Sequence, residues 1–287
     1  ADQFVAVSQP PDRQGLQDSM LPDGVGQFIQ SVLPENFPGL GRIGADGTNR
    51  QENHPSCFHI GLQLLALHCL SSLKYQVVPL YGVWEKFDDI EFDKLPNQFV
   101  LKCTHDSGSY VICKDKDKFD KRAAKKKLSA ALKRNFYYVG REFPYRNVPP
   151  RIIAEKYMED QNGTFVDYKF SCFNGCVDCV MVCLDRHIND VKFYFFDKNW
   201  NLKRLNVRGK NAPEKFTIPK PSCMDEMFEI AAKLSKNIPF VRVDLFECDG
   251  QVYFGEMTFY PDSGFDANLL PETDEYFGSL IDLTKIK

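Results

Sequence analysis

Charged residues stand in the middle of two strongly apolar stretches within residues 240–259, which meet at Asp249-Gly250. An Asp-Gly pair between alternating apolar residues predicts a β-hairpin. Arg242, Asp244 and Glu256 would then lie inside strands, where an unpaired ion is strongly destabilising. The chain must therefore fold into a sheet that carries a polar site on one face, occupied by partner side chains, a metal or a ligand.

The length of the turn decides which side chains share that face. A loop with an odd number of residues, closing on Gly250, places Asp244 and Glu256 on the same face, whereas a two-residue loop separates them. Arg242 points the same way as Asp244 because it lies two residues earlier. Two carboxylates with phosphate oxygens suit magnesium, and a guanidinium suits phosphate. A purely structural arginine–carboxylate network is the alternative interpretation.

A second candidate site precedes this hairpin in the sequence. Residues 99–103 read as an apolar strand with one cation, Lys102, and a loop of small residues, 104–109, follows it. The amides of such a loop can wrap a phosphate, although the sequence matches neither the Walker pattern nor the dinucleotide fingerprint. Taken alone, the loop is an ordinary turn and the lysine an edge residue. Together with the later carboxylates, a phosphate site is favoured.

The pattern of elements predicts an α+β chain with a smaller strand-and-helix lobe and a larger lobe built on an antiparallel sheet. We expect domains at 1–70, 71–155 and 156–287, the first beginning with an irregular extension rich in Gly, Pro and Asn. Apolar periodicity predicts helices at 58–73, 118–135 and 223–235, strands at 77–84, 99–103, 110–114 and 151–158, and hairpins at 168–184, 191–204 and 240–259.

Composition excludes several classes of function. The 287 residues are 43% hydrophobic and carry 36 basic and 39 acidic side chains, so a net charge of -3 argues against nucleic-acid binding. The longest nearly apolar run, 58–70, is shorter than the ~20 residues that span a bilayer, so we expect no transmembrane segment. No signal peptide is evident. Ten cysteines lie mostly in apolar runs, which favours reduced thiols in a cytoplasmic protein.

One group of cysteines superficially resembles a metal site. Asn174-Gly175 predicts a tight hairpin, and regular alternation from that turn places Cys172, Cys179 and Cys183 on one face and Cys176 on the other. Four thiolates spread along extended strands cannot close a tetrahedron. We therefore interpret these residues as structural cysteines.

The motifs and their order resemble the ATP-grasp fold, with two lobes and a nucleotide cleft between them. A strand lysine, a glycine loop and a later Arg-Val-Asp and Glu-Met-Thr pair follow one another in that order. More closely, the chain resembles the TupA-like ATP-grasp family of polysaccharide and teichuronopeptide biosynthesis over about residues 75–265. The matching segments are 101–109, 141–142, 150–158, 167–170 and 259–265.

The resemblance implies ATP and Mg2+ as cofactors and assigns residues to them. Lys102 would contact the α- and β-phosphates, and Lys169 would be a second phosphate cation. Asp244 and Glu256 would hold magnesium beside Arg242, while Thr258 stands where family members usually have asparagine. The phosphate loop would include His105, Ser107, Gly108 and Ser109, and the hinge that reads adenine would be Glu155, Lys156, Tyr157 and Met158, with Glu159 or Asp160 at the ribose.

The resemblance also implies a reaction. ATP-grasp enzymes typically phosphorylate a carboxylate and let an amine attack the acyl phosphate, which needs few side-chain bases. The partners would be a carboxylate acceptor, such as a uronic acid on a glycan, and an amine donor. Candidate contacts for the acceptor are Arg141, Arg151, Arg186 and His187.

Two alternatives come from other classes. A glycosyltransferase would need a metal-binding Asp-x-Asp, and Asp115-Lys-Asp117 has that spacing, although it reads as the solvated start of a helix. A nucleotide-binding protein without turnover is the other, because Thr258 replaces the usual asparagine.

Overall fold

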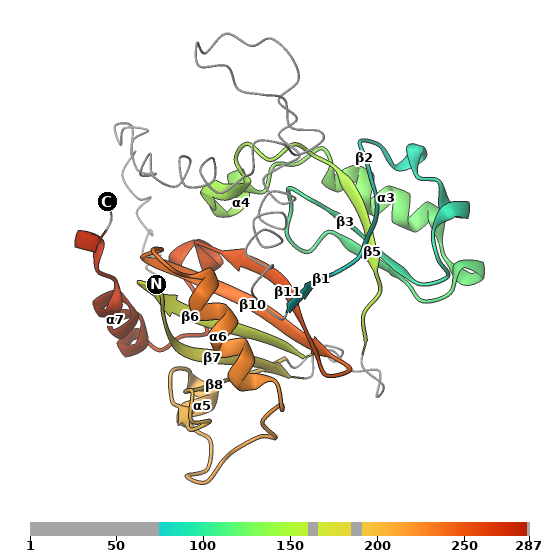
Figure 1. The fold of residues 1–287 in the computed structure, drawn as a ribbon. Helices are drawn as coiled ribbons and strands as arrows, with labels where there is room; N and C mark the ends of the chain where they lie inside the picture. Colours follow the sequence, from blue (N-terminus) through green and yellow to red (C-terminus); the bar gives the residue numbers. More distant parts are fainter. Residues whose placement is uncertain (1–74, 160–165, 185–190, 286–287) are drawn as a thin grey trace, which may run out of the picture.

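Two β-sheets and the helices packed on them form two lobes (Figure 1). The computed structural model describes residues 75–159, 166–184 and 191–285. The helix predicted at 58–73 and the extension before it lie outside the described residues. The predicted α+β class is confirmed, because each lobe combines a sheet with at least one helix.

The smaller lobe is a four-stranded antiparallel sheet with one long helix on it. Its strand order is β2 (Leu80–Trp84), β5 (Ile152–Lys156), β3 (Phe99–Cys103) and β4 (Tyr110–Cys113). The helix α3 (Lys121–Ala131) covers one face, where Phe99, Leu101 and Leu128 are fully buried. Residues between them along β3 point to the other face.

The larger lobe holds a seven-stranded sheet that is antiparallel except at one edge. Strand β1 pairs in parallel with β11, and the remaining neighbours are antiparallel. The order is β1 (Tyr75–Val77), β11 (Gln251–Thr258), β10 (Phe240–Cys248), β6 (Asp167–Phe173), β7 (Cys176–Leu184), β8 (Lys192–Phe196) and β9 (Leu202–Lys203). The described residues also form the short helices α4 (Tyr137–Gly140) and α5 (Val207–Lys210) and the helix α7 (Pro271–Leu280).

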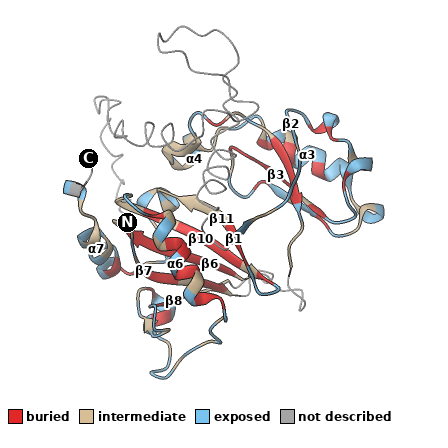
Figure 2. Ribbon diagram, in the orientation of Figure 1, coloured by how far each residue is buried: buried red, intermediate tan, exposed pale blue. Residues whose placement is uncertain are grey.

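The core of this lobe lies between one face of the sheet and α6 (Met224–Leu234). The predicted apolar stripe of α6 packs there, with Met224, Met227 and Ala231 fully buried against Phe170 and Val243. Figure 2 shows this concentration of buried residues in the central strands and in α6. The opposite face of the same strands carries the polar residues of β6, β10 and β11.

The structure corrects several of the predicted element boundaries. The strand predicted at 77–84 is two strands in different sheets, because Pro79 lacks the amide that a continuous ladder needs. The helix predicted from residue 118 begins at Lys121, where the Asp120 side chain accepts from the Ala123 amide and caps it. The strand predicted at 151–158 ends at Lys156.

The cysteine hairpin forms at Asn174-Gly175, but its faces differ from the expectation. A register shift between Ser171 and Cys172 adds a residue to β7, so Cys179 and Cys183 lie on the face opposite Cys172. All eight cysteines within the described ranges are free thiols. No helix in the part of the chain that the structure describes has both the length and the apolar character needed to cross a membrane.

Candidate functional site

The β10–β11 hairpin brings Asp244 and Glu256 directly opposite each other, by a route that the sequence did not reveal. The turn has two residues, because Cys248 pairs with Gln251. Such a turn alone would separate the carboxylates, but a β-bulge at Gly255 adds one residue to β11 and restores the pairing. The two carboxylates share a face, as the magnesium interpretation requires, but through the bulge and not through the odd-numbered loop that the sequence analysis made the condition.

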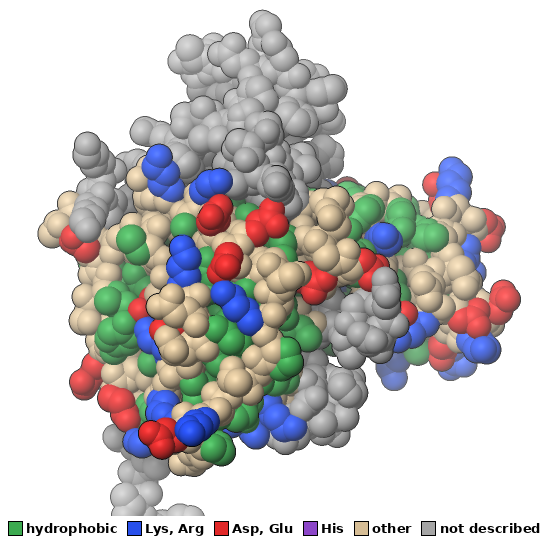
Figure 3. Space-filling model, turned by 60° about the horizontal axis from the view of Figure 1, so that its bottom comes forward, with side chains coloured by type: hydrophobic (Ala, Val, Ile, Leu, Met, Phe, Trp, Pro, Cys, Tyr) green, Lys and Arg blue, Asp and Glu red, His purple; other side chains and the backbone are tan. Residues whose placement is uncertain are grey.

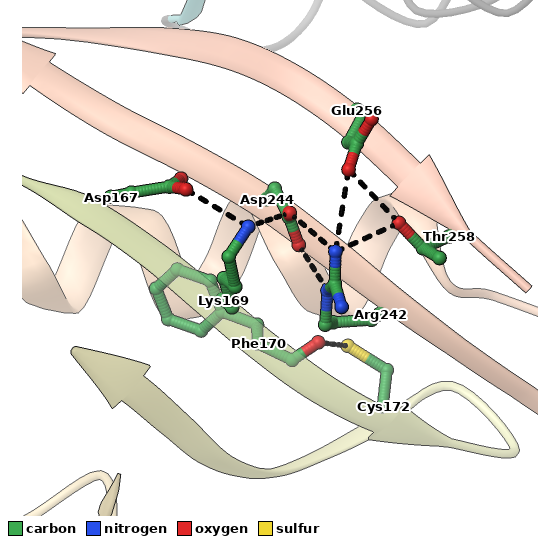
Figure 4. Close-up of polar contacts among 8 residues, drawn as sticks. All are labelled: Asp167, Lys169, Phe170, Cys172, Arg242, Asp244, Glu256 and Thr258. Carbon is green, nitrogen blue, oxygen red and sulfur yellow. Dashed lines mark hydrogen bonds and ion pairs between the residues drawn. The ribbon is translucent and has the colours of Figure 1, made fainter. Parts of the chain in front are cut away.

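Arg242 connects the polar groups of this face (Figure 4). Its Nε donates to Asp244 Oδ1 over 2.7 Å, and its Nη2 donates to Asp244 Oδ2 over 2.9 Å. The same Nη2 lies 3.3 Å from Glu256 Oε1 and 3.1 Å from Thr258 Oγ1. The Thr258 hydroxyl in turn donates to Glu256 Oε1 over 3.2 Å. The structure thus joins the four residues predicted on this hairpin into one network.

Strand β6 adds a second cation to the network. Lys169 lies opposite Asp244 across the β6–β10 pair and donates to Asp244 Oδ2. It also forms an ion pair of 2.9 Å with Asp167, two residues earlier on the same face. Lys169 is therefore fixed between two carboxylates and points to the same place as Arg242 (Figure 4). The sequence analysis included Lys169 but missed Asp167.

Burial and charge oppose each other at these groups. Burial alone would raise the pKa of Asp244, but Arg242 and Lys169 outweigh it and the pKa is lowered. For Lys169, burial lowers the pKa, while Asp244 and Asp167 raise it above its usual value. The pKa of Glu256 is raised by burial and by Asp244. The pKa of Asp244 is thus shifted down and that of Glu256 is shifted up.

Glu256 has the geometry of a cation ligand. Its two contacts use Oε1, so Oε2 makes no hydrogen bond with other described residues, and its side chain is 41% exposed. Among the residues that the structure describes, Asp244 Oδ1 accepts only from Arg242, which leaves one lone pair. Hard carboxylate oxygens of this kind suit magnesium. Over the described ranges, no group of three or more His, Cys, Asp or Glu side chains is arranged to hold a metal by itself, so phosphate oxygens would have to complete the shell.

Lys102 lies on the face of the smaller sheet that α3 does not cover. Its ammonium is 2.7 Å from Glu155 Oε2, and its side chain is 34% exposed while that of Glu155 is 7% exposed. Apolar side chains that are at least a third exposed surround this pair on the same face: Leu80, Val83, Tyr110 and Ile112. A partly exposed apolar face with one oriented ammonium matches the needs of a purine with phosphates attached.

The loop after β3 is folded around the carboxylate of Asp106. Asp106 accepts from the Ser107 amide over 2.8 Å and from the Ser109 hydroxyl, and forms a 2.8 Å ion pair with Arg134. Gly108 has φ 79°, and no atom lies within 4 Å of the position that a Cβ would take there. Two donors that a phosphate would use are therefore turned toward the loop's own carboxylate.

His105 occupies a different place from the one expected of a phosphate ligand. Its side chain is buried, and Nε2 donates to the Ala131 carbonyl over 3.1 Å. Nδ1 has no hydrogen-bond partner among the described residues. The imidazole thus packs in the core of the smaller lobe, and only the His105 backbone faces the loop.

The predicted hinge joins the two sheets. Met158 packs against Phe246 and Tyr253, whose rings stack at 5.3 Å on the polar face of the larger sheet. The Tyr157 hydroxyl donates to Glu159 over 2.6 Å, and Lys114 pairs with the same carboxylate over 3.1 Å. The Met158 backbone makes no hydrogen bond with other described residues, so it can bind a ligand. Lys156 is exposed and its amide donates to the Pro79 carbonyl.

A segment after α4 approaches the same site. Burial raises the pKa of Glu142, Asp262 and Glu256 raise it further, and Arg242 opposes them, so all three groups lie near this carboxyl. Tyr145 likewise has a raised pKa through burial and through Glu256. Glu142 was among the residues that resemble the family, but the sequence analysis proposed no role for it or for Tyr145. Nothing in the sequence indicates that this segment folds back onto β11.

The remaining residues that the sequence analysis proposed as ligand contacts lie in different parts of the structure. Arg151 forms a 2.9 Å ion pair with Glu85. Asp115 caps the short helical turn at Lys116–Lys118 by accepting from the Asp117 amide over 3.1 Å, as expected of a solvated helix start. Asp160, Arg186 and His187 lie outside the described residues.

A lysine on one sheet, and an Arg-x-Asp with a facing glutamate on the other, agree with the ATP-grasp arrangement expected from the sequence. The sequence profile of the TupA-like ATPgrasp family matches residues 50–282. The chain belongs to this family.

Solved structures resemble the chain more distantly. D-alanine–D-alanine ligase from Bacillus anthracis with ATP has a TM-score of 0.43 and 19% identity, covering 80% of this chain and 66% of that chain. ATP-grasp ligase PsnB with its minimal precursor, Mg and ADP gives a TM-score of 0.40 and 9% identity, over 79% and 59%. D-alanine–D-alanine ligase from Helicobacter pylori gives 0.39 and 16%, over 76% and 60%. The chain thus spans at most about two thirds of their length. No curated protein matches it.

Proposed function

We propose that the protein is an ATP-dependent, magnesium-requiring ligase that joins a carboxylate to an amine through an acyl phosphate. The observation that carries this proposal is the placement of Asp244 and Glu256 on one face, beside two cations, Arg242 and Lys169. Phosphoryl transfer needs little more than such positioning and charge stabilisation.

Different residues of the chain bind the nucleotide and stabilise the transferring phosphoryl group. Lys102, oriented by Glu155, binds the phosphates, and the apolar face around it receives the purine. Glu256 and Asp244 would hold magnesium, which would supply positive charge next to the phosphates. Arg242 and Lys169 stabilise the transferring phosphoryl group.

We propose a uronic acid of a polysaccharide as the acceptor, with an amino compound as the donor. In this scheme an uncharged amine attacks the acyl phosphate, and the bond between the acyl carbon and the phosphate oxygen breaks as the amide forms. The departing phosphate, whose charge the cations stabilise, takes the proton that the amine loses. The polysaccharide context is what the sequence resemblance to the TupA-like ATP-grasp family implies. The glycosyltransferase alternative gains no support from Asp115, whose side chain caps its own turn.

Release of ADP tests the reaction. We expect ADP to form only when ATP, magnesium, a uronic acid and an amine are all present, with an amide as the product in mass spectra. Glu256→Gln is expected to reduce the rate at least about a hundredfold, because it removes a charge that metal binding and phosphoryl transfer both need. The chain should stay folded, since this side chain is 41% exposed.

The matched control is Glu229→Gln, which makes the same change at an exposed position of α6. Its rate should equal that of the wild type. Full activity in Glu256→Gln would contradict the proposed metal ligand. Magnesium-dependent ATP binding without any ADP release would instead support a nucleotide-binding protein, and product formation without ATP a transferase.

A further inference from the structure

The loop between β3 and β4 holds an anion among hydrogen-bond donors, and that anion is its own Asp106 carboxylate. The Ser107 amide donates to Asp106 Oδ1 over 2.8 Å, and the Ser109 hydroxyl donates to Oδ2. Arg134 Nη2 donates to the same Oδ2 over 2.8 Å and lies 3.0 Å from the Ser109 hydroxyl. A backbone amide, a hydroxyl and a guanidinium are also the donors that proteins present to a phosphate.

Burial differs between the two partners of this ion pair. The Asp106 side chain is 4% exposed, whereas the Arg134 side chain is 58% exposed. A buried carboxylate needs its donors, so the three contacts hold Asp106 in place. The Nε and Nη1 atoms of Arg134 make no hydrogen bond with other described residues. An anion that arrives from solvent can therefore reach the guanidinium.

The base of the loop is fixed, and its tip is not. The Thr104 amide donates to the Arg151 carbonyl over 3.0 Å, and the Cys103 amide donates to the Ser109 carbonyl over 3.2 Å. Gly108 at the tip is exposed, and no other part of the described chain comes within 4 Å of a Cβ at that position. Because glycine accepts many backbone conformations, the tip can change its shape while the contacts at the base stay intact.

Tyr145 places the loop beside the proposed reaction centre. The ring of Phe136, two residues after Arg134, lies 5.0 Å from the Tyr145 ring and meets it edge-on. Burial raises the pKa of Tyr145, Glu256 raises it further, and Asp106 adds to the rise. The Tyr145 hydroxyl therefore lies near the carboxylates of both Asp106 and Glu256. A nucleotide whose phosphates reach Glu256 must pass close to the loop.

A phosphate at this loop needs the donors that Asp106 occupies. Two anions cannot share them at contact distance, because like charges repel strongly in a partly buried place. The carboxylate must therefore leave its donors when a phosphate arrives. The alternative is that Asp106 shapes the loop for phosphate and stays where it is. Removing its charge would then weaken phosphate binding, whereas removing a competitor would strengthen it.

We propose that Asp106 is an internal competitor of ATP, whose carboxylate occupies the phosphate position of the loop until the nucleotide displaces it, and that Arg134 then binds a phosphate of ATP in its place. This inference rests on the proposed function, because it takes ATP as the ligand. The affinity for ATP is lowered by the fraction of chains in which the carboxylate still occupies the donors.

Isothermal titration calorimetry of the full chain, with ATP and magnesium in one series and adenosine in the other, tests the competition. Asp106→Asn keeps the size of the side chain and one acceptor oxygen but removes the charge. We expect this variant to bind ATP at least about tenfold more tightly than the wild type, as for a wild-type loop that is open in fewer than about one chain in ten. Its affinity for adenosine should equal that of the wild type, because adenosine has no phosphate.

The role of Arg134 is tested without the charge of Asp106. The double variant Asp106→Asn/Arg134→Met should lose the gain for ATP, because the guanidinium that would bind the phosphate is absent. The matched control is Asp88→Asn, which makes the same change at an exposed carboxylate that pairs with Lys125 of α3 over 2.6 Å. It should bind ATP as the wild type does.

A second substitution keeps the test decisive if Asp106→Asn does not fold. Asp106→Ser also removes the carboxylate and should show the same gain for ATP, with thermal melting as the check that each variant is folded. Unchanged or weaker ATP binding by these variants would overturn the inference and show that Asp106 shapes the loop. An equal gain for adenosine, or a gain that survives Arg134→Met, would overturn it as well.

The ADP assay separates this inference from the proposed function. A chain that binds ATP more tightly after Asp106→Asn but releases no ADP with any acceptor and amine has the internal competitor without the ligase activity. A chain that releases ADP with acceptor and amine, and whose affinity for ATP does not rise after Asp106→Asn, has the ligase activity without the internal competitor.

Discussion

Asp244 is the residue on which the charges of the site converge. It is 2% exposed, and both of its oxygens accept from cations, Arg242 and Lys169. Breaking a buried ion pair on one side leaves the partner's charge uncompensated, which is more destabilising than losing a surface pair. Glu256, which is far more exposed, lacks this structural role.

We therefore expect Asp244→Asn to lower the free energy of unfolding by about 3 kcal/mol at neutral pH, in addition to abolishing turnover. The loss stays near the lower end for such a change because Lys169 keeps Asp167 and Arg242 keeps Glu256. Urea denaturation followed by circular dichroism measures it, with Glu256→Gln as the comparison.

The difference in the free energy of unfolding between wild type and Asp244→Asn should also depend on pH, in a direction that the pKa shift of Asp244 determines. The pKa of Asp244 is lowered in the folded chain, so its stabilising contribution is present above the usual aspartate pKa of about 3.9 and is lost as pH falls below that value. The difference between wild type and Asp244→Asn should thus be constant from pH 6 to 8 and shrink below about pH 4. A difference that grows on acidification would contradict the assignment.

At the scale of residues, the sequence indicated which charged side chains belong to the site, but not which other side chains they contact. The charged positions within apolar strands were visible in the sequence, since only a bound partner justifies Arg242 or Asp244 there. The roles of Asp167 and Asp106 were not visible, because a carboxylate at the start of a strand or in a loop is ordinary in any sequence. What distinguishes them is the cation that each contacts, Lys169 or Arg134.

At the scale of elements, the β10–β11 hairpin shows why strand existence is easier to predict than register. The Asp249-Gly250 turn and the apolar alternation indicated both strands. The bulge at Gly255 has no comparable signal, because glycine within a strand also occurs without one. The same limitation explains the error at Cys179, where another register shift reverses the faces.

Gly255→Ala tests the importance of this bulge. A Cβ at this position would lie 3.0 Å from the carbonyl oxygen of Asp244, a backbone atom that cannot move aside without shifting β10. We expect at least about a tenfold loss of turnover and a destabilisation of about 1–2 kcal/mol, as for other overpacked positions.

Gly278→Ala in α7 is the matched control, because nothing lies within 4 Å of the Cβ that it adds. Alanine is the better helix former, so stability should be equal or slightly higher and the rate unchanged. Retention of full activity by Gly255→Ala would show that the facing of Asp244 and Glu256 does not depend on the bulge.

At the scale of the whole molecule, the proposed site is divided between two sheets. Lys102 comes from the smaller sheet and Glu256 from the larger, and the strand β5 leads from one to the other through Met158. Charged side chains in Figure 3 gather toward the outer end of the smaller lobe, while apolar ones show nearer the larger lobe. The two-lobed organisation was predictable, because the order of motifs was specific.

A nucleotide that bridges the lobes gives the final prediction. ATP should raise the melting temperature of the wild type, and magnesium should increase that shift, because binding to the folded state alone stabilises it. Glu256→Gln should keep the shift with ATP alone and lose the increase with magnesium.

A second variant tests the cation on the smaller sheet. Removing Lys102 by itself would leave the buried Glu155 without its cation, so the double variant Lys102→Met/Glu155→Gln is the clean test. It should lose most of the shift with ATP alone, because the phosphates then lack their cation on the smaller sheet. If the double variant kept the wild-type shift while Glu256→Gln lost it entirely, the nucleotide would contact only the larger sheet, and the bridging arrangement would be wrong.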